Sequence, residues 1–149
     1  MRDLVKDPTR TKRLILSVIL GFFFSFQSYA QSQESTAPLP PRPPVNVTVQ
    51  DLPNDRGGAT IIGWELSPDD DGIGKVTGYL VTRSESASGP FETVGDATRG
   101  TLEFSDNQTD DSKEYYYKVD AFFEALDAAG QNVRIISAAV PVGPVKSYG

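Results

Sequence analysis

From residue 45 onward, apolar and polar residues alternate in short runs that are separated by turn-forming residues. Val45, Val47 and Val49 alternate in the first run, and the longest run extends from Tyr115 to Ala125. A period of two is typical of half-buried β-strands, and no run shows the 3.6-residue period of an amphipathic helix. The pattern predicts strands at 45–49, 59–66, 76–83, 91–94, 101–104, 115–125 and 133–140. Seven short strands without a helix predict an all-β, antiparallel sandwich.

The first thirty residues have the order of a secretory signal peptide. Basic residues precede the apolar run Leu14–Phe26, and small residues follow at Ser28 and Ala30. The run is shorter than the roughly 20 residues that span a membrane as a helix. We therefore expect cleavage after Ala30 and a secreted or cell-envelope location, that is, an extracytoplasmic one. The alternative is an uncleaved N-terminal signal, which would be the protein's only attachment to a membrane.

The remaining chain divides into three parts. Residues 31–44 are polar and then rich in proline, which indicates a stiff linker. Residues 38–41 also fit the P-x-x-P pattern that aromatic grooves recognise, which is an alternative interpretation. We assign residues 45–142 to the sandwich and residues 143–149 to a C-terminal tail. Because the chain ends shortly after the last predicted strand, we expect it to be a piece of a longer envelope or secreted protein.

Composition and charge restrict the chemistry that is open to the chain. It contains no cysteine and no histidine, so disulfides, zinc fingers and mechanisms that need imidazole or thiolate are excluded. Removal of residues 1–30 leaves nine of the 14 basic and 18 of the 20 acidic residues, a net charge of −9. Such a charge repels phosphate backbones, so we expect no nucleic-acid partner. No motif indicates a cofactor.

Several motifs occur in the order that is typical of one family. Pro43 and Pro44 precede the first strand, Trp64 follows Ile62 by two residues on the second, and the third begins G-Y-x-V at 78–81. The strand at 115–121 reads Y-x-Y-x-V-x-A. From 43 to 142 the chain resembles a fibronectin type III domain. The resemblance implies a seven-stranded, immunoglobulin-like sandwich. The family's leucine, proline and glycine are missing from 109–114, so we expect a looser tyrosine corner at Tyr115.

Alternation and the resemblance together predict the buried residues. Tyr115, Tyr117, Val119, Ala121 and Phe123 share one face of their strand, while residues 116, 118, 120 and 122 point the other way. We expect the first face to pack against the second and third strands. The predicted structural core is Ile62, Trp64, Tyr79, Val81, Tyr115, Tyr117 and Val119.

Two acidic clusters are candidates for chemistry. Asp69, Asp70 and Asp71 precede Gly72 and could offer oxygen ligands to calcium, but the spacing lacks a twelve-residue calcium loop, and a solvated loop is the favoured interpretation. The second group, Asp106, Asp110, Asp111 and Glu114, is expected to be solvated in the same way. A catalytic carboxylate pair needs two carboxyl groups a fixed distance apart across a cleft, and a small two-sheet sandwich offers no obvious deep cleft, so we predict that the chain is not an enzyme.

The outward residues of two strands give a candidate interaction surface. In the family the third and the penultimate strands pair, which implies that Leu80 and Thr82 lie beside Tyr116 and Lys118. An exposed strip of this kind could bind another protein or a neighbouring domain. The sequence therefore favours a non-catalytic spacer or protein-interaction module. The alternative is an accessory carbohydrate-binding domain of a secreted enzyme, which would need a row of exposed aromatic residues.

Overall fold

The structure is a computed structural model that describes residues 38–53 and 58–148. The described residues form eight strands and no helix, so no helix long and apolar enough to cross a membrane occurs among them. The strands are β1 (Val45–Asp51), β2 (Thr60–Glu65), β3 (Gly78–Ser84), β4 (Glu92–Thr98), β5 (Glu103–Asp106), β6 (Glu114–Leu126), β7 (Asn132–Ile136) and β8 (Val142–Lys146). The signal peptide, most of the linker and residues 54–57 lie outside the described residues.

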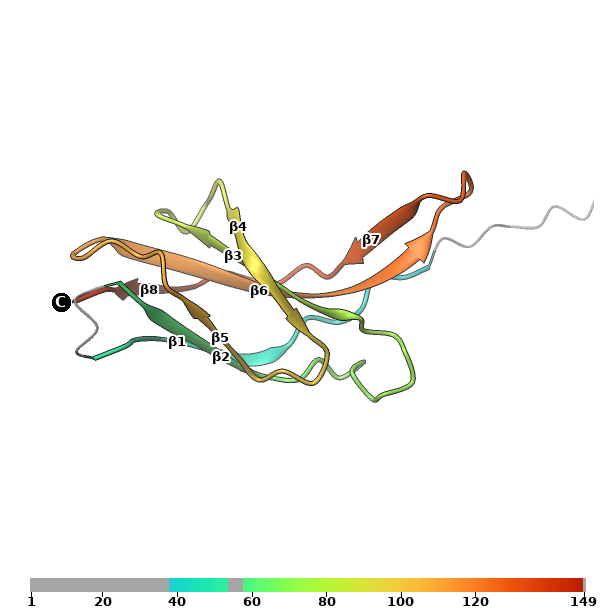
Figure 1. Cartoon of the computed structure of the whole chain (residues 1–149), viewed down its shortest axis with the longest axis horizontal. Coiled ribbons are helices and arrows are strands. Elements are labelled where there is room, and N and C mark those ends of the chain that lie inside the picture. The colour runs from blue at the N-terminus through green and yellow to red at the C-terminus, as the bar shows by residue number, and fades with distance from the viewer. Residues whose placement is uncertain (1–37, 54–57, 149) are drawn as a thin grey trace, which may run out of the picture. The chain divides into compact units, whose positions relative to one another are not determined.

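The strands form two antiparallel sheets, as the sequence predicted. One sheet has the order β1-β2-β5; the other has the order β4-β3-β6-β7, with β8 also paired to β6 (Figure 1). β6 is the longest strand and spans the second sheet, and its C-terminal end pairs with β7 in a ribbon that extends beyond the other strands (Figure 1). Alternating side chains of both sheets face each other and form the core.

The core lies between the sheets around Trp64 and the tyrosines. All seven residues of the predicted core are at most 5% exposed. The rings of Trp64 and Tyr79 are 5.5 Å apart between centroids and are tilted by 51°, a geometry that aromatic pairs favour. The Tyr79 hydroxyl donates to Asp70 at 2.8 Å and accepts from the backbone N–H of Ser67 at 3.1 Å. The tyrosine thus fixes the loop after β2 to the core.

The outer face of β6 is less open than the alternation predicted. Phe122 is 4% exposed and Asp120 is also 4% exposed, whereas Phe123, expected in the core, is only half-buried. The Arg134 guanidinium lies 4.2 Å above the Phe122 ring. Asp120 accepts hydrogen bonds from the Ser137 hydroxyl at 2.9 Å and the Ala139 N–H at 2.7 Å. The segment after β7 therefore covers this part of the sheet.

The end of the chain also differs from the sequence prediction. The strand expected at 133–140 ends at Ile136, and β8 occupies residues that were assigned mainly to the tail. Proline and glycine in Val142–Lys146 argue against a regular strand, and the pairing of β8 with β6 is indeed irregular near Gly143. A Cβ on Gly143 would lie 2.7 Å from the Tyr115 carbonyl oxygen. Glycine is therefore required for this close approach.

Candidate functional site

The predicted strip lies on the outer face of the five-stranded sheet. β3 and β6 pair so that Thr82 is opposite Lys118, while Leu80 is opposite Asp120 and Tyr116 is opposite Ser84. The structure therefore brings Leu80, Thr82, Tyr116 and Lys118 to neighbouring positions, and all four are half-buried.

Two residues from outside these strands lie against the strip, Phe91 beside Lys118 and Gly143 beside Tyr116. The Lys118 ammonium lies 5.3 Å from the centroid of the Phe91 ring, which precedes β4, and 3.8 Å from Asp120. The strip thus combines the Tyr116 ring, the aliphatic groups of Leu80 and Thr82, and the Lys118 cation, which Asp120 partly neutralises.

The Asp69–Asp71 cluster is used for internal contacts. Asp69 is bound by Arg42, Asp70 accepts from Tyr79 and from the Gly100 N–H, and Asp71 accepts from the Ile73 N–H. Among residues 38–53 and 58–148 no group of three acidic side chains is placed to share one metal ion. The carboxylates bind different segments instead: Asp69 the segment before β1, Asp70 both β3 and the turn after β4, and Asp71 its own loop.

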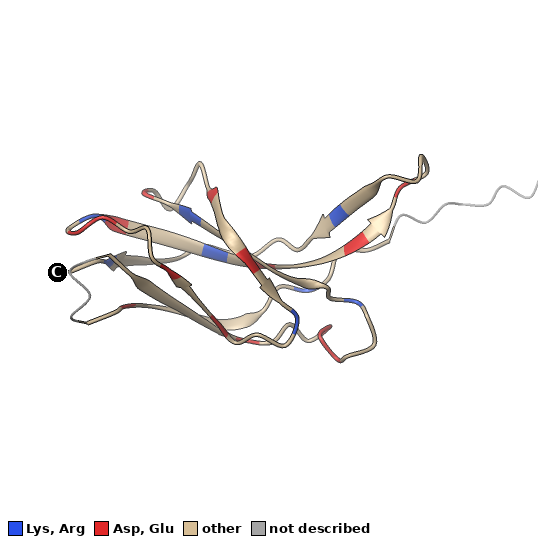
Figure 2. Ribbon diagram, viewed as in Figure 1, with Lys and Arg blue, Asp and Glu red and all other residues tan. Residues whose placement is uncertain are grey.

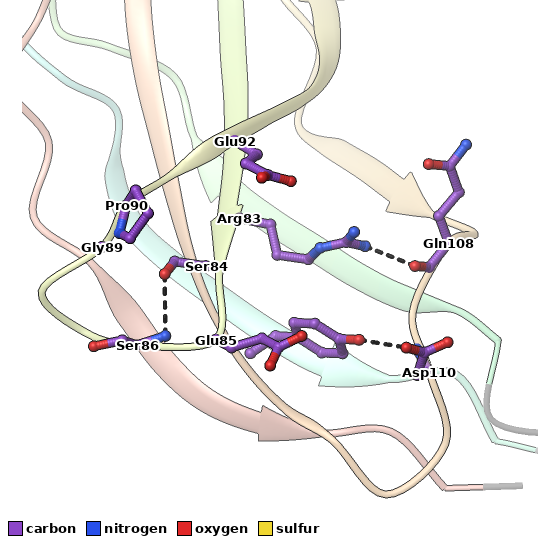
Figure 3. A pocket seen from close by; sticks show the side chains of 10 residues that line it. Arg83, Ser84, Glu85, Ser86, Gly89, Pro90, Glu92, Gln108 and Asp110 are labelled. Atoms are coloured by element: carbon purple, nitrogen blue, oxygen red, sulfur yellow. Dashed lines mark hydrogen bonds between the residues drawn. The ribbon is translucent and has the colours of Figure 1, made fainter.

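A hollow of about 350 Å³ lies at the C-terminal end of β3, whereas the Asp69–Asp71 loop precedes the N-terminal end of this strand. Its walls are the turn after β3 and the loop that contains Gln108 and Asp110, and Arg83 extends between them (Figure 3). Tyr115 also lines the hollow. Lys113 joins the two walls through Asp110 at 2.8 Å and Glu85 at 3.0 Å. These bonds, with Asp110 first and Glu85 second, raise the pKa of the Lys113 ammonium above its usual value. The hollow is open to solvent and is bordered by charged groups of both signs.

Below the hollow, Asp106 is the centre of a buried hydrogen-bond network. Its Oδ2 accepts from Arg83 Nη1 at 2.6 Å and from the Tyr117 hydroxyl at 2.9 Å, and its Oδ1 accepts from the Gln108 N–H at 3.0 Å. The Asp106 side chain is completely buried, and that of Arg83 is 21% exposed. Arg83 also donates to the Gln108 carbonyl and lies 4.9 Å from the centroid of the Tyr115 ring.

The charges of this network stabilise one another. Burial opposes the positive charge of Arg83, but the carboxylate of Asp106 outweighs it and raises the pKa of the guanidinium. Burial and the nearby Asp106 carboxylate both raise the pKa of Tyr117, so its hydroxyl stays protonated and remains a donor. Arg83 is thus held in its charged form and Tyr117 in its protonated form, and in these forms both donate to Asp106.

The tyrosine corner forms without the family's usual residues. The Tyr115 hydroxyl accepts from the Asp110 N–H at 3.0 Å (Figure 3), so the looser corner that the sequence indicated is not observed. Ser112 takes a φ of +68° in the stretch where the family carries a glycine. Its N–H donates to the carbonyl of Ser147, just after β8, at 2.9 Å. This bond holds the loop in place of a glycine turn.

Asp106 is buried, although the sequence predicted it to be solvated. The alternation that predicted the core also indicates that Asp106 points inward, because Asp106 follows Phe104 by two residues and both belong to β5. Phe104 packs against the core, and Asp106 shares its inward direction. Asp110, from the same acidic group, is exposed as predicted and pairs with Lys113.

Comparison with known proteins identifies the fold. No family model matches the sequence. Among solved structures, the twitchin kinase region from C. elegans matches with a TM-score of 0.50 and 21% identity, over 75% of this chain and 17% of that one. A Fn3-like protein from Clostridium thermocellum has a TM-score of 0.48 and 20% identity, over 73% of this chain and 98% of that one.

The fold follows from the architecture together with the likeness to the twitchin kinase region. The described residues have a fibronectin type III-like fold, a two-sheet immunoglobulin-like sandwich. At these levels of identity the likeness concerns the fold alone, and the function has to be argued from the surface of this chain.

Proposed function

We propose that the chain is a non-catalytic, extracytoplasmic module that binds another protein or a neighbouring domain and holds it at a defined distance. The observation that supports this most strongly is that the charged side chains of the domain are engaged in contacts within the domain. In the hollow and in the Asp69–Asp71 loop, carboxylates and cations are bonded to each other or to the backbone. A catalytic site would instead need groups that converge on a bound substrate.

The partner that we propose is a protein. The described part of the chain carries no basic stripe, and Figure 2 shows acidic and basic positions scattered over the strands and loops. Five basic residues of this part lie in ion pairs: Arg42, Arg83, Lys113, Lys118 and Arg134. A surface of this kind offers little attraction to nucleic acid.

The carbohydrate-binding alternative receives no support from the aromatic residues. The single tryptophan is 5% exposed and belongs to the core. Tyr116 is half-buried on the strip, and Tyr148 is 58% exposed beyond β8. No row of exposed rings, such as a sugar chain would need, occurs among the described strands.

A photo-crosslinking experiment tests the proposed binding face. A photoreactive phenylalanine analogue is placed at Tyr116 in the native host, and a matched control carries it at Ser105, on β5 of the other sheet. We expect one discrete covalent adduct from position 116 that is absent from position 105. The adduct should weaken when Leu80→Ser is added. Equal adducts from both positions, or none from position 116, would contradict the proposed face.

The proposed location is tested separately. N-terminal sequencing of the protein from the fraction outside the cytoplasm should give Gln31 as the first residue. Recovery of the intact N-terminus in the cytoplasm would contradict export.

A further inference from the structure

The proline-rich segment before β1 is hydrogen-bonded to the sandwich at Arg42. The Arg42 guanidinium donates to Asp69 Oδ1 from Nη2 at 2.7 Å and from Nε at 3.1 Å, and its backbone N–H donates to Asp69 Oδ2 at 2.7 Å. Arg42 therefore engages both oxygens of one carboxylate with side chain and main chain. Such a bidentate contact defines a direction as well as a distance.

Further contacts fix the same segment. The Ser67 hydroxyl donates to the Arg42 carbonyl at 2.7 Å and accepts from the Asp69 N–H at 3.1 Å. Of the four prolines within two residues of Arg42, Pro41 and Pro44 are buried, Pro43 is half-buried and Pro40 is exposed. The last four residues of the expected linker are thus part of the folded domain.

The contacting groups belong to a rigid part of the sandwich. Ser67 is 3% exposed, and its N–H donates to the hydroxyl of the buried Tyr79. Asp70, three residues after Ser67, accepts a hydrogen bond from the same hydroxyl. The loop that holds Arg42 is therefore attached to the core through Tyr79, so it offers a fixed base for the segment.

We propose that Arg42, Ser67 and Asp69 form a clasp that fixes the proline-rich segment on the sandwich and sets the direction in which residues 38–41 leave the domain. Because the segment is stiff, the direction that the clasp sets is kept along the length of the segment. In a polyproline conformation, residues 38–41 would extend for about 12 Å from the clasp. A change of direction at the clasp therefore displaces the far end of the segment. The clasp does not depend on the identity of any partner.

The clasp is tested by the distance between two spin labels. The chain has no native cysteine, so cysteines at Leu39, which is 85% exposed, and at the exposed Thr93 on β4 carry the labels. Pulsed dipolar spectroscopy on the otherwise unchanged chain should give one narrow distance peak. Arg42→Gln and Asp69→Asn should each lose the narrow peak and give a broad distribution.

A control variant separates the clasp from the loss of any surface ion pair. Lys113→Gln removes the exposed pairs with Glu85 and Asp110 at another loop, and it should keep the narrow peak. The denaturation midpoint of each variant shows that the sandwich is folded. A broad distribution in the parent chain, or a narrow peak that survives in both clasp variants, would overturn the proposal.

Discussion

Two arginine–aspartate pairs of the domain have nearly equal distances and different surroundings. Arg42–Asp69 and Arg83–Asp106 have nitrogen–oxygen distances of 2.7 and 2.6 Å. The Arg42 side chain is 63% exposed, whereas the Asp106 side chain is completely buried. The outer pair holds a segment of chain to the surface, and the inner pair completes a hydrogen-bond network under a hollow. Distance alone therefore says little about what an ion pair contributes.

The inner pair is expected to give the largest effect on stability. Asp106→Ala removes the acceptor of three hydrogen bonds and leaves the Arg83 charge and the Tyr117 hydroxyl without it. We expect the free energy of unfolding to fall by about 3–5 kcal/mol. Urea denaturation followed by circular dichroism measures the change. Asp69→Ala is the matched control from the outer pair, and a loss as large as that of Asp106→Ala would remove the distinction between the pairs.

A smaller effect is expected from the hydroxyl that joins the inner pair to the core. Tyr117→Phe keeps the buried ring and removes only the donor to Asp106, which still accepts from Arg83 and the Gln108 N–H. We expect a loss of about 1.5–3 kcal/mol, as for hydrogen bonds to charged groups. The same denaturation experiment measures it. Tyr116→Phe, on the outer face of the same strand, is the control and should change stability little. An unchanged midpoint for Tyr117→Phe would show that the network does not contribute to stability.

The outer pair should give the smallest effect and a distinct pH dependence. The hydrogen bond from the Arg42 side chain, followed by that from its backbone, lowers the pKa of Asp69 from 3.8 to about 2. Because the pKa is lower in the folded state, the pair contributes stability above about pH 4 and loses it as the pH falls toward 2.

Arg42→Gln tests this dependence. The difference in unfolding free energy between the parent chain and the variant should be greatest above about pH 4 and should shrink toward zero near pH 2. Denaturation curves at a series of pH values for both proteins give the difference directly. A difference that stays constant over this interval, or grows as the pH falls, would show that the Asp69 carboxylate is not the partner.

The parts of the molecule that the sequence predicted are those with a local period. Tyr115, Tyr117 and Val119 alternate within one strand, and this is enough to place them in the core beside Trp64. The parts that it missed depend on residues far apart. Arg42 meets Asp69 across 27 positions, and Ser137 covers Asp120 from the segment after β7. No pattern along the chain carries such pairings.

Two misses have a more specific cause. β8 contains Gly143 and Pro144, which argue against a strand, and it forms through a close approach that only a glycine permits. Asp106 was judged by its charge and by its acidic neighbours, although its position two residues after Phe104 indicated an inward direction. An acidic residue at an inward-facing position of a strand's alternation is therefore a candidate for a buried ion pair.

We propose that the charged clusters of this sandwich stabilise its fold and that its outer face is the surface for binding. Two double-mutant cycles, Arg83→Ala with Asp106→Ala and Arg42→Ala with Asp69→Ala, test it most directly when the four unfolding free energies of each are measured at neutral pH. We predict a coupling energy of about 2 kcal/mol for the inner pair and a clearly smaller value for the outer pair. A coupling energy near zero for Arg83 and Asp106 would contradict the account, because it would leave a buried charge network with no structural role.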